Sequence, residues 1–294
     1  MSALIIRPGA LGDTLMLLPS LVELQGRCGV TFVGREPGLG LLRRHAHNAM
    51  DFEGPGWRLL LMNKAENGAL PVSHAEKVVA FLSDPDGLIR RNLRRFYPQA
   101  SIHMFPSLPG REERIHVALY AARCLHRAGL PVDPQRAIAR AMDRGLLLRN
   151  HGVRSRTLLV CHPGSGSPAK NYDTPFWMEL IQRLKPLVLL GPAEKDLYPF
   201  FREEAEEHGI QILPCPSMEA LCDLLKSARL YIGHDSGITH LAAMLEAPTM
   251  ALFRSSDATL WKPLGPYVRT IYHGAGGSPA FAGEVIEAAR TLLR

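Results

Sequence analysis

Short apolar runs alternate along the chain with stretches in which apolar residues recur every three or four positions. The short runs are typical of buried strands, and the spaced pattern is typical of helices that cover a sheet. In the first half the pattern predicts strands at 3–7, 30–33, 77–82 and 100–104 and helices at 14–25, 37–46, 88–95 and 112–128. In the second half it predicts strands at 157–161, 187–190, 210–213, 229–232, 248–253 and 268–272 and helices at 174–184, 194–208, 217–227, 237–245 and 279–293. Strands that alternate with helices in this way indicate an α/β fold with parallel sheets.

The length of 294 residues suits two α/β domains of ordinary size. Residues 129–156 combine prolines, glycines and arginines and are interpreted as the connection between the domains. We therefore predict a Rossmann-like domain over residues 1–150 and a second one over residues 151–276, facing a cleft. The last helix, within 277–294, is expected to pack back on the first domain. The segment 49–72 has no clear period and is expected to hold loops that face a ligand.

Apolar residues make up 46% of the chain and charged residues 21%, as in ordinary globular proteins. No apolar run approaches the ~20 residues that a membrane-spanning helix requires. Residues 1–7 already have the pattern of a strand, so we expect no secretory signal peptide. The five cysteines are scattered and form no CxxC pair, which indicates reduced thiols and argues against a structural zinc site. These features predict a cytoplasmic protein.

The net charge of +6 is concentrated in part on one predicted helix. Residues four apart share a helix face, and this helix carries such pairs at Arg90, Arg91, Arg94 and Arg95. One interpretation is a solvated helix face, and the other is contact with anionic lipid head groups or a phosphorylated substrate. A nucleic-acid partner is disfavoured, because aromatic residues are only 7% of the chain and do not interleave with the arginines.

Three loops that each lead from a strand into a helix carry the candidate chemistry. The loop after the strand at 229–232 reads Gly233-His234-Asp235-Ser236-Gly237 and opens a helix in which His240 lies one turn along. Unpaired N–H groups at a helix start, together with the positive end of its dipole, make an anion site. Phosphate is therefore the expected ligand of this loop. Asp235 is expected to hold sugar or ribose hydroxyls, the alternative being that it caps the helix.

The second loop runs from His162 to Lys170 and contains Ser165, Gly166 and Ser167. Its glycines let the backbone approach a ligand, its serines offer hydroxyls, and Lys170 offers a point charge suited to phosphate. Neither of the common nucleotide-binding motifs fits it. We predict that this loop and the loop around Ser236 converge on one diphosphate.

The third loop, Pro8-Gly9-Ala10-Leu11-Gly12-Asp13, follows the first strand. Asp13 is a candidate general base at its tip, although an aspartate before Thr14 would also be a favoured helix N-cap.

Together the loops match three motifs of one family in the family's order: a Gly-Asp pair followed by Pro, an HPGSGS-x-x-K-x-W loop and a G-x-D-[ST]-G-x-x-H-x-A helix start. In this chain they are Gly12-Asp13 with Pro19, then His162 to Lys170 with Tyr172 at the usual Trp, then Gly233, Asp235, Ser236, Gly237, His240 and Ala242. The chain thus resembles the bacterial heptosyltransferases, glycosyltransferase family 9. It departs from the family at Phe253–Ala258, where Arg254 replaces a common glycine beside the expected nucleotide site.

The resemblance implies the GT-B architecture and an inverting transfer of sugar, most of all heptose from ADP-heptose, to a lipopolysaccharide-core or related cell-envelope acceptor. It implies Asp13 as the base and Lys170 as the cation that neutralises the leaving diphosphate. Donor contacts are expected from the two phosphate loops, and acceptor contacts from Gly12, Arg90, Arg91 and Arg94. The enzyme would need no cofactor and would work at the inner face of the inner membrane.

Asp84-Pro85-Asp86 matches the D-x-D pattern of metal-dependent glycosyltransferases. Proline between the acids and Gly87 after them favour a turn over a metal site. Because the helix dipole, Lys170 and the loop amides could replace a divalent metal, we predict metal-independent transfer. Two alternatives stay open: a nucleotide-sugar epimerase of the same architecture, and a catalytically silent nucleotide-sugar or glycolipid binding protein, favoured if Arg254 blocks the donor pocket.

Overall fold

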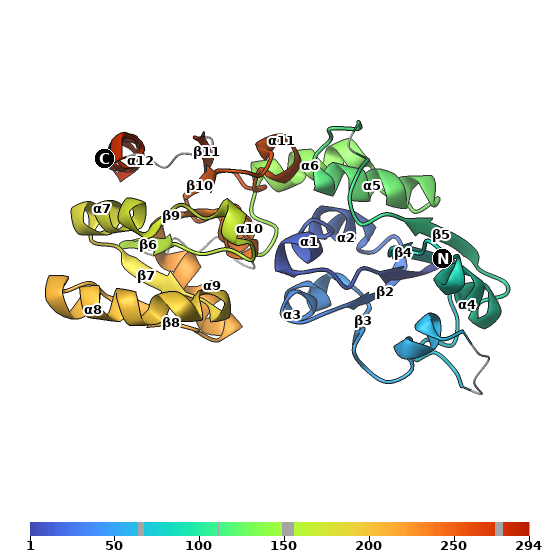
Figure 1. Ribbon diagram of the computed structural model, residues 1–294. Coiled ribbons are helices and arrows are strands. Elements are labelled where there is room, and N and C mark those ends of the chain that lie inside the picture. The colour runs from blue at the N-terminus through green and yellow to red at the C-terminus, as the bar shows by residue number, and fades with distance from the viewer. Residues whose placement is uncertain (64–67, 111, 149–155, 274–278, 294) are drawn as a thin grey trace. The chain divides into compact units, whose positions relative to one another are not determined.

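The computed structural model describes residues 1–63, 68–110, 112–148, 156–273 and 279–293 (Figure 1). The chain forms two compact units, Met1–Arg140 and Ala141–Arg294, each with its own parallel β-sheet. The predicted α/β class with two Rossmann-like sheets is thereby confirmed. The predicted boundaries after residues 150 and 276 both lie outside the described residues.

The first unit contains a five-stranded sheet in the order β3-β2-β1-β4-β5, with every neighbouring pair parallel. Its strands are β1 (Ser2–Ile6), β2 (Gly29–Gly34), β3 (Asn48–Asp51), β4 (Lys77–Phe81) and β5 (Ser101–Phe105). Its helices are α1 (Leu11–Leu15), α2 (Leu18–Leu24), α3 (Gly38–Leu42), η1 (Arg43–His45), η2 (Trp57–Leu61), α4 (Leu88–Phe96), α5 (Val117–Arg127) and α6 (Pro134–Asp143), which runs into the second unit. The chain builds outward from β1 to β3 and then returns to the other side of β1 with β4. The strand order therefore reverses between β1 and β4.

The second unit contains a six-stranded sheet in the order β11-β10-β9-β6-β7-β8, again parallel throughout. Its strands are β6 (Leu158–His162), β7 (Leu187–Leu190), β8 (Ile212–Pro214), β9 (Ala228–His234), β10 (Thr249–Phe253) and β11 (Val268–Tyr272). Its helices are η3 (Pro168–Lys170), α7 (Thr174–Leu184), η4 (Pro192–Leu197), α8 (Tyr198–His208), α9 (Met218–Ser227), α10 (Gly237–Met244), α11 (Ala258–Trp261) and α12 (Pro279–Leu293). Here the strand order reverses between β6 and β9.

Helix α12 belongs to the core of the second unit. It packs against α7, and its buried Phe281 and Val285 join the apolar cluster that the strands of this sheet form. This contact accounts for the apolar face of the helix. Packing of α12 against the first domain stays a prediction.

The predicted helix over 14–25 is two helices, α1 and α2, because of Pro19. In one continuous helix the proline ring would clash with the carbonyl of residue 15. The chain instead breaks and restarts, which places Pro19 in the first turn of α2, where proline is tolerated.

The connection predicted over 129–156 contains helix α6. Asp133 accepts hydrogen bonds from the backbone N–H groups of Gln135 and Arg136, and Ala137 and Ala141 are buried on one face. The helix was missed because its buried residues are alanines, whereas the larger Ile138 and Met142 lie off the buried face.

Candidate functional site

In the second unit, two loops meet where the strand order reverses. Open α/β sheets bind ligands at the carboxyl ends of the strands at such a point. The loop after β6 carries Ser165 to Lys170, and the loop after β9 carries Asp235 and Ser236. Since β6 and β9 are direct neighbours in the sheet, both predicted phosphate loops lie at this edge.

A salt bridge joins the two loops. The Lys170 ammonium lies 2.7 Å from the Asp235 Oδ2 atom, and His240 Nε2 lies 3.4 Å from Oδ1 of the same carboxylate. Asp235 and His240 are buried, whereas the Lys170 side chain is 31% exposed and lies over the ring of Trp261. The structure therefore brings together three of the predicted site residues, with the lysine as the member that solvent and ligands reach.

The Asp235 carboxylate is held in its charged form. Burial alone would raise its pKa, but hydrogen bonds and charge from His240 and Lys170 outweigh burial and lower the pKa to about 2. Asp235 does not cap α10: the cap is Ser236, whose hydroxyl accepts from the Thr239 N–H at 3.4 Å. The capping alternative for Asp235 is therefore wrong.

The loop after β6 is fixed from within. The Ser165 hydroxyl accepts the Ser167 N–H at 3.3 Å and lies 2.6 Å from Asn171 Oδ1. Arg254 donates to the Asn171 carbonyl at 2.7 Å, so this unusual residue helps to hold the loop. Among the described residues, no atom beyond the chain neighbours lies within 4 Å of where a side chain at Gly166 would begin, so the loop backbone is open at this position.

Gly164 is required by a neighbour that the sequence analysis did not single out. A Cβ atom at this position would lie only 1.9 Å from the Oε1 atom of Glu194. Glu194 is buried, accepts the Gly191 N–H at 2.6 Å and lies 3.3 Å from His162 Nε2. Burial raises the pKa of Glu194, but the contacts with His162 and the backbone prevail and lower it. The charged carboxylate of Glu194 thus packs beneath the loop after β6, against Gly164 and His162.

In the first unit, Asp13 lies in the first turn of α1, at the carboxyl end of β1 where that strand order reverses. The residue that precedes this helix is Ala10, so the N-cap alternative for Asp13 is wrong. Gly9 packs directly against Asp13, since a Cβ at Gly9 would lie 2.6 Å from the Asp13 Cβ atom. Gly12 occupies the same turn.

A buried arginine holds the Asp13 turn. Arg7 is 1% exposed, and its Nε donates to the Asp13 carbonyl at 3.0 Å while Nη2 donates to the Ser107 carbonyl at 3.1 Å. Its guanidinium lies over the Phe81 ring. Burial lowers the pKa of Arg7, and the charge of Asp13 opposes that shift. Arg7 therefore ties together the ends of β1, β4 and β5.

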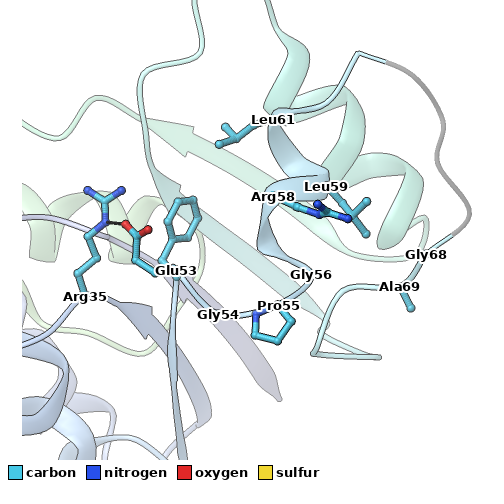
Figure 2. Close-up of a pocket in the computed structure, with 11 residues that line it drawn as sticks. Arg35, Glu53, Gly54, Pro55, Gly56, Arg58, Leu59, Leu61, Gly68 and Ala69 are labelled. Atoms are coloured by element: carbon cyan, nitrogen blue, oxygen red, sulfur yellow. Dashed lines mark ion pairs between the residues drawn. The ribbon is translucent and has the colours of Figure 1, made fainter.

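Hollows open at two places among the described residues of the first unit. One, of about 690 Å³, lies at the carboxyl ends of β4 and β5, and its lining includes Ser83, Arg90 and Ser107. The other, of about 610 Å³, lies in the segment that was expected to hold ligand-facing loops, beside the Arg35–Glu53 ion pair (Figure 2).

The D-x-D segment is a turn that caps α4. Asp84 accepts the backbone N–H groups of Ile89 and Arg90 at 2.9 and 3.0 Å. Among the described residues, no group of three or more His, Cys, Asp or Glu side chains is placed to hold a metal ion. No helix in the described part of the chain is long and apolar enough to span a membrane.

The sequence pattern of one family, glycosyltransferase family 9 (heptosyltransferase), matches residues 117–287, more than half of the chain. The chain belongs to glycosyltransferase family 9. A search of curated proteins found no match. The family assignment makes the protein a glycosyltransferase and sets aside the epimerase and silent-binding alternatives.

Solved structures agree with this family 9 assignment at the level of fold. The E. coli heptosyltransferase WaaC with ADP superimposes with a TM-score of 0.68 at 17% identity, over 99% of this chain and 100% of that one. E. coli ADP-heptose LPS heptosyltransferase II gives 0.67 at 17% identity, over 100% and 98%. A family 9 glycosyl transferase from Veillonella parvula gives 0.66 at 16% identity, over 99% and 97%. These likenesses identify the GT-B fold of this family 9 enzyme.

Tyr172, which stands at the family's usual Trp, is a further residue that shapes the site of this glycosyltransferase. Its backbone N–H donates to His234 Nε2 at 2.8 Å, and its hydroxyl lies 3.0 Å from the carbonyls of Phe253 and His273. Burial raises the pKa of Tyr172 to about 12. Tyr172 thus joins the loop after β6 to the ends of β9, β10 and β11. These contacts depend on the order of the strands in the sheet, so the sequence alone did not show them.

Proposed function

We propose that this family 9 glycosyltransferase moves heptose from ADP-heptose to a lipopolysaccharide-core or related cell-envelope acceptor, with inversion and without a metal. Three related structures support the donor: they are described as WaaC with ADP, WaaC with ADP-2-deoxy-2-fluoro heptose, and ADP-heptose LPS heptosyltransferase II. The second of these matches with a TM-score of 0.66 at 17% identity.

The observation that carries the proposal is the Lys170–Asp235–His240 cluster at the reversal point of the second sheet. A partly exposed ammonium, the backbone of an open glycine loop and the N-terminus of α10 supply positive charge and N–H donors in one place. A diphosphate is the ligand class that uses all three. We propose that they neutralise the leaving group in the way that a divalent metal does in other enzymes.

In the reaction, Asp13 takes the proton of the acceptor hydroxyl while that oxygen attacks the anomeric carbon. The bond from this carbon to the diphosphate oxygen breaks, and the electron pair leaves with ADP. One displacement of this kind inverts the anomeric centre. Arg7 holds the Asp13 turn through the main chain, so the base is presented on a rigid support. Gly12, Arg90, Arg91 and Arg94 are proposed to contact the acceptor.

The test compares Asp13→Ala with Asp143→Ala, a control at the exposed end of α6. Loss of a general base typically lowers turnover by about 10²–10⁴-fold. We expect that loss for Asp13→Ala in transfer from ADP-heptose to a lipopolysaccharide-core acceptor, with unchanged affinity for ADP by calorimetry. The control should transfer at the rate of the unmodified protein, and excess chelator should leave that rate unchanged. Full turnover by Asp13→Ala would remove Asp13 from the reaction, and loss of transfer in chelator would refute metal independence.

A further inference from the structure

Helix α4 (Leu88–Phe96) carries four arginines and no acidic residue. Its inner face buries Ile89, Asn92 and Leu93 against the first unit. The arginines, Arg90, Arg91, Arg94 and Arg95, are all exposed. At 3.6 residues per turn they span an arc of about 140° and a length of about 7.5 Å. The outer face of the helix is therefore continuously basic.

Within the described part of the chain, the charges of Arg90, Arg91 and Arg94 are not compensated by a carboxylate. No described carboxylate lies within ion-pair distance of Arg90, Arg91 or Arg94. The nearby Asp84 is committed to the backbone N–H groups at the start of the helix. Arg95 lies over the ring of Phe96. An exposed like-charged cluster of this kind costs self-repulsion unless an anionic surface meets it.

Exposed apolar side chains lie on two elements near α4. Helix η2 packs against α4 and carries Leu61, which is 54% exposed, and the exposed Arg58 (Figure 2). Leu108, 44% exposed, lies on the wall of the 690 Å³ hollow that also includes Arg90. Surfaces that lie in the head-group region of a membrane combine Lys and Arg with exposed Leu, Phe or Trp.

We propose that the outer face of α4, together with Leu61 on the neighbouring helix η2, docks on an anionic lipid bilayer. The arginines are exposed over a wide arc of the helix, and only Arg90 among them lines the hollow, so as a set they fit a plane of many phosphates better than one enclosed phosphate group. The inference deepens the proposed function and rests on it, because an acceptor anchored in a membrane must be reached at that surface. Because α4 begins at the carboxyl end of β4, the docked face adjoins the edge of the sheet that carries Asp13.

The experiment measures binding of the full chain to vesicles by co-sedimentation, with neither donor nor glycolipid acceptor present. Vesicles of phosphatidylcholine alone are compared with vesicles that contain phosphatidylglycerol. Each arginine near an anionic surface contributes about a fivefold gain in partitioning. Reversal of three charges in R90E/R91E/R94E should therefore lower binding to the anionic vesicles by about a hundredfold or more. Binding of the unmodified protein should fall steeply with salt.

Two further variants keep the result interpretable. R43E/R202E/R269E changes three exposed arginines elsewhere and has the same net charge, zero, because each reversal removes two units from +6. It should bind the vesicles at least ten times more tightly than the α4 variant. R90K/R91K/R94K keeps the charge but loses the planar guanidinium fork, so it should bind anionic vesicles like the unmodified protein.

Three results would overturn the proposal: no preference of the unmodified protein for anionic vesicles, equal losses in the two charge-reversed variants, or loss of binding in the lysine variant. The last result would indicate a specific phosphate site on α4. Because the vesicles contain no substrate, failure here leaves the transfer reaction testable by the Asp13 variants. Thermal unfolding of each variant confirms that the first unit is folded.

Discussion

Replacement of Lys170 by alanine tests the diphosphate site most directly. The lysine is the exposed member of the cluster, and its ammonium lies 2.7 Å from a carboxylate that is 2% exposed. The substitution removes the cation that is proposed to meet the diphosphate. It also removes one of the two partners of the Asp235 carboxylate in the cluster, so that only His240 remains there.

Two effects add to the expected loss of affinity. A hydrogen bond between charged groups contributes about 1.5–3 kcal/mol. Repulsion between the Asp235 carboxylate and a phosphate about 5 Å away is on the order of 3 kcal/mol at an effective dielectric constant of 20, an upper bound because the site is open to water. Since these terms overlap, we expect a total of about 3 kcal/mol. That corresponds to roughly a hundredfold weaker binding of ADP.

Calorimetric titration with ADP measures the effect, and Lys226→Ala is the matched control. Lys226 lies in the same unit and pairs with Asp223 at 2.9 Å, but its partner is 53% exposed and lies on α9. Its loss should leave ADP affinity within twofold of the unmodified protein. Unchanged affinity in Lys170→Ala, or an equal loss in both variants, would refute the reasoning. Thermal unfolding without ligand separates a loss of binding from a loss of fold.

Two further predictions concern stability. Burial, reinforced by the charge of His162, lowers the pKa of His234 to about 3, so the unfolded chain binds the proton more readily and acid weakens the fold. The fold keeps its full stability above pH ~6.5 and loses stability as the pH falls toward 3; at pH 4.5 the loss amounts to about 3 kcal/mol. In the variant H234Q, urea unfolding at several pH values should show a smaller loss of free energy between pH 6.5 and 4.5, and an identical slope would contradict the assignment. Glu23 is 5% exposed and accepts two hydrogen bonds from Arg136, at 2.9 and 2.6 Å. Glu23→Ala should lower the free energy of unfolding by about 1–3 kcal/mol. The loss stays within this range because the exposed Arg136 can be solvated by water once its partner is gone. A change below 0.5 kcal/mol would show that the contact does not hold α6 in place.

Local signals in the sequence predicted much of the fold. Apolar strands stand out because parallel sheets bury them on both faces, and the predicted helix over 174–184 is α7. Asp173 caps it by accepting the Phe176 N–H at 3.2 Å. The same holds for the loops, whose glycine and serine content is legible without knowledge of the fold. Strand β3 was missed because the four residues at 48–51 lie in a segment without a clear period.

The contacts that arrange the loops were not predictable in this way. Lys170 and Asp235 are 65 residues apart, and His162 and Glu194 are 32 apart. Their meeting depends on strand order, because β6 lies beside β9 on one side and β7 on the other. Motif spacing shows which side chains enter a loop. It does not show which of these side chains form hydrogen bonds within the loop itself, as the hydroxyls of Ser165 and Ser236 do.

A carboxylate inside an anion site repels the ligand, so the presence of Asp235 has to be explained. Its two neighbours, Lys170 and His240, offset that repulsion. His240 and Lys170 lie on different oxygens of the carboxylate, so the charge that an incoming diphosphate meets is that of the cluster. The buried carboxylate also fixes an otherwise flexible lysine, whose rotamer entropy is then lost on folding and not on binding. Asp235 is in this respect a support for Lys170. A site that must bind a diphosphate and then release it gains from this compromise, because full exposure of the lysine charge would favour retention of the product.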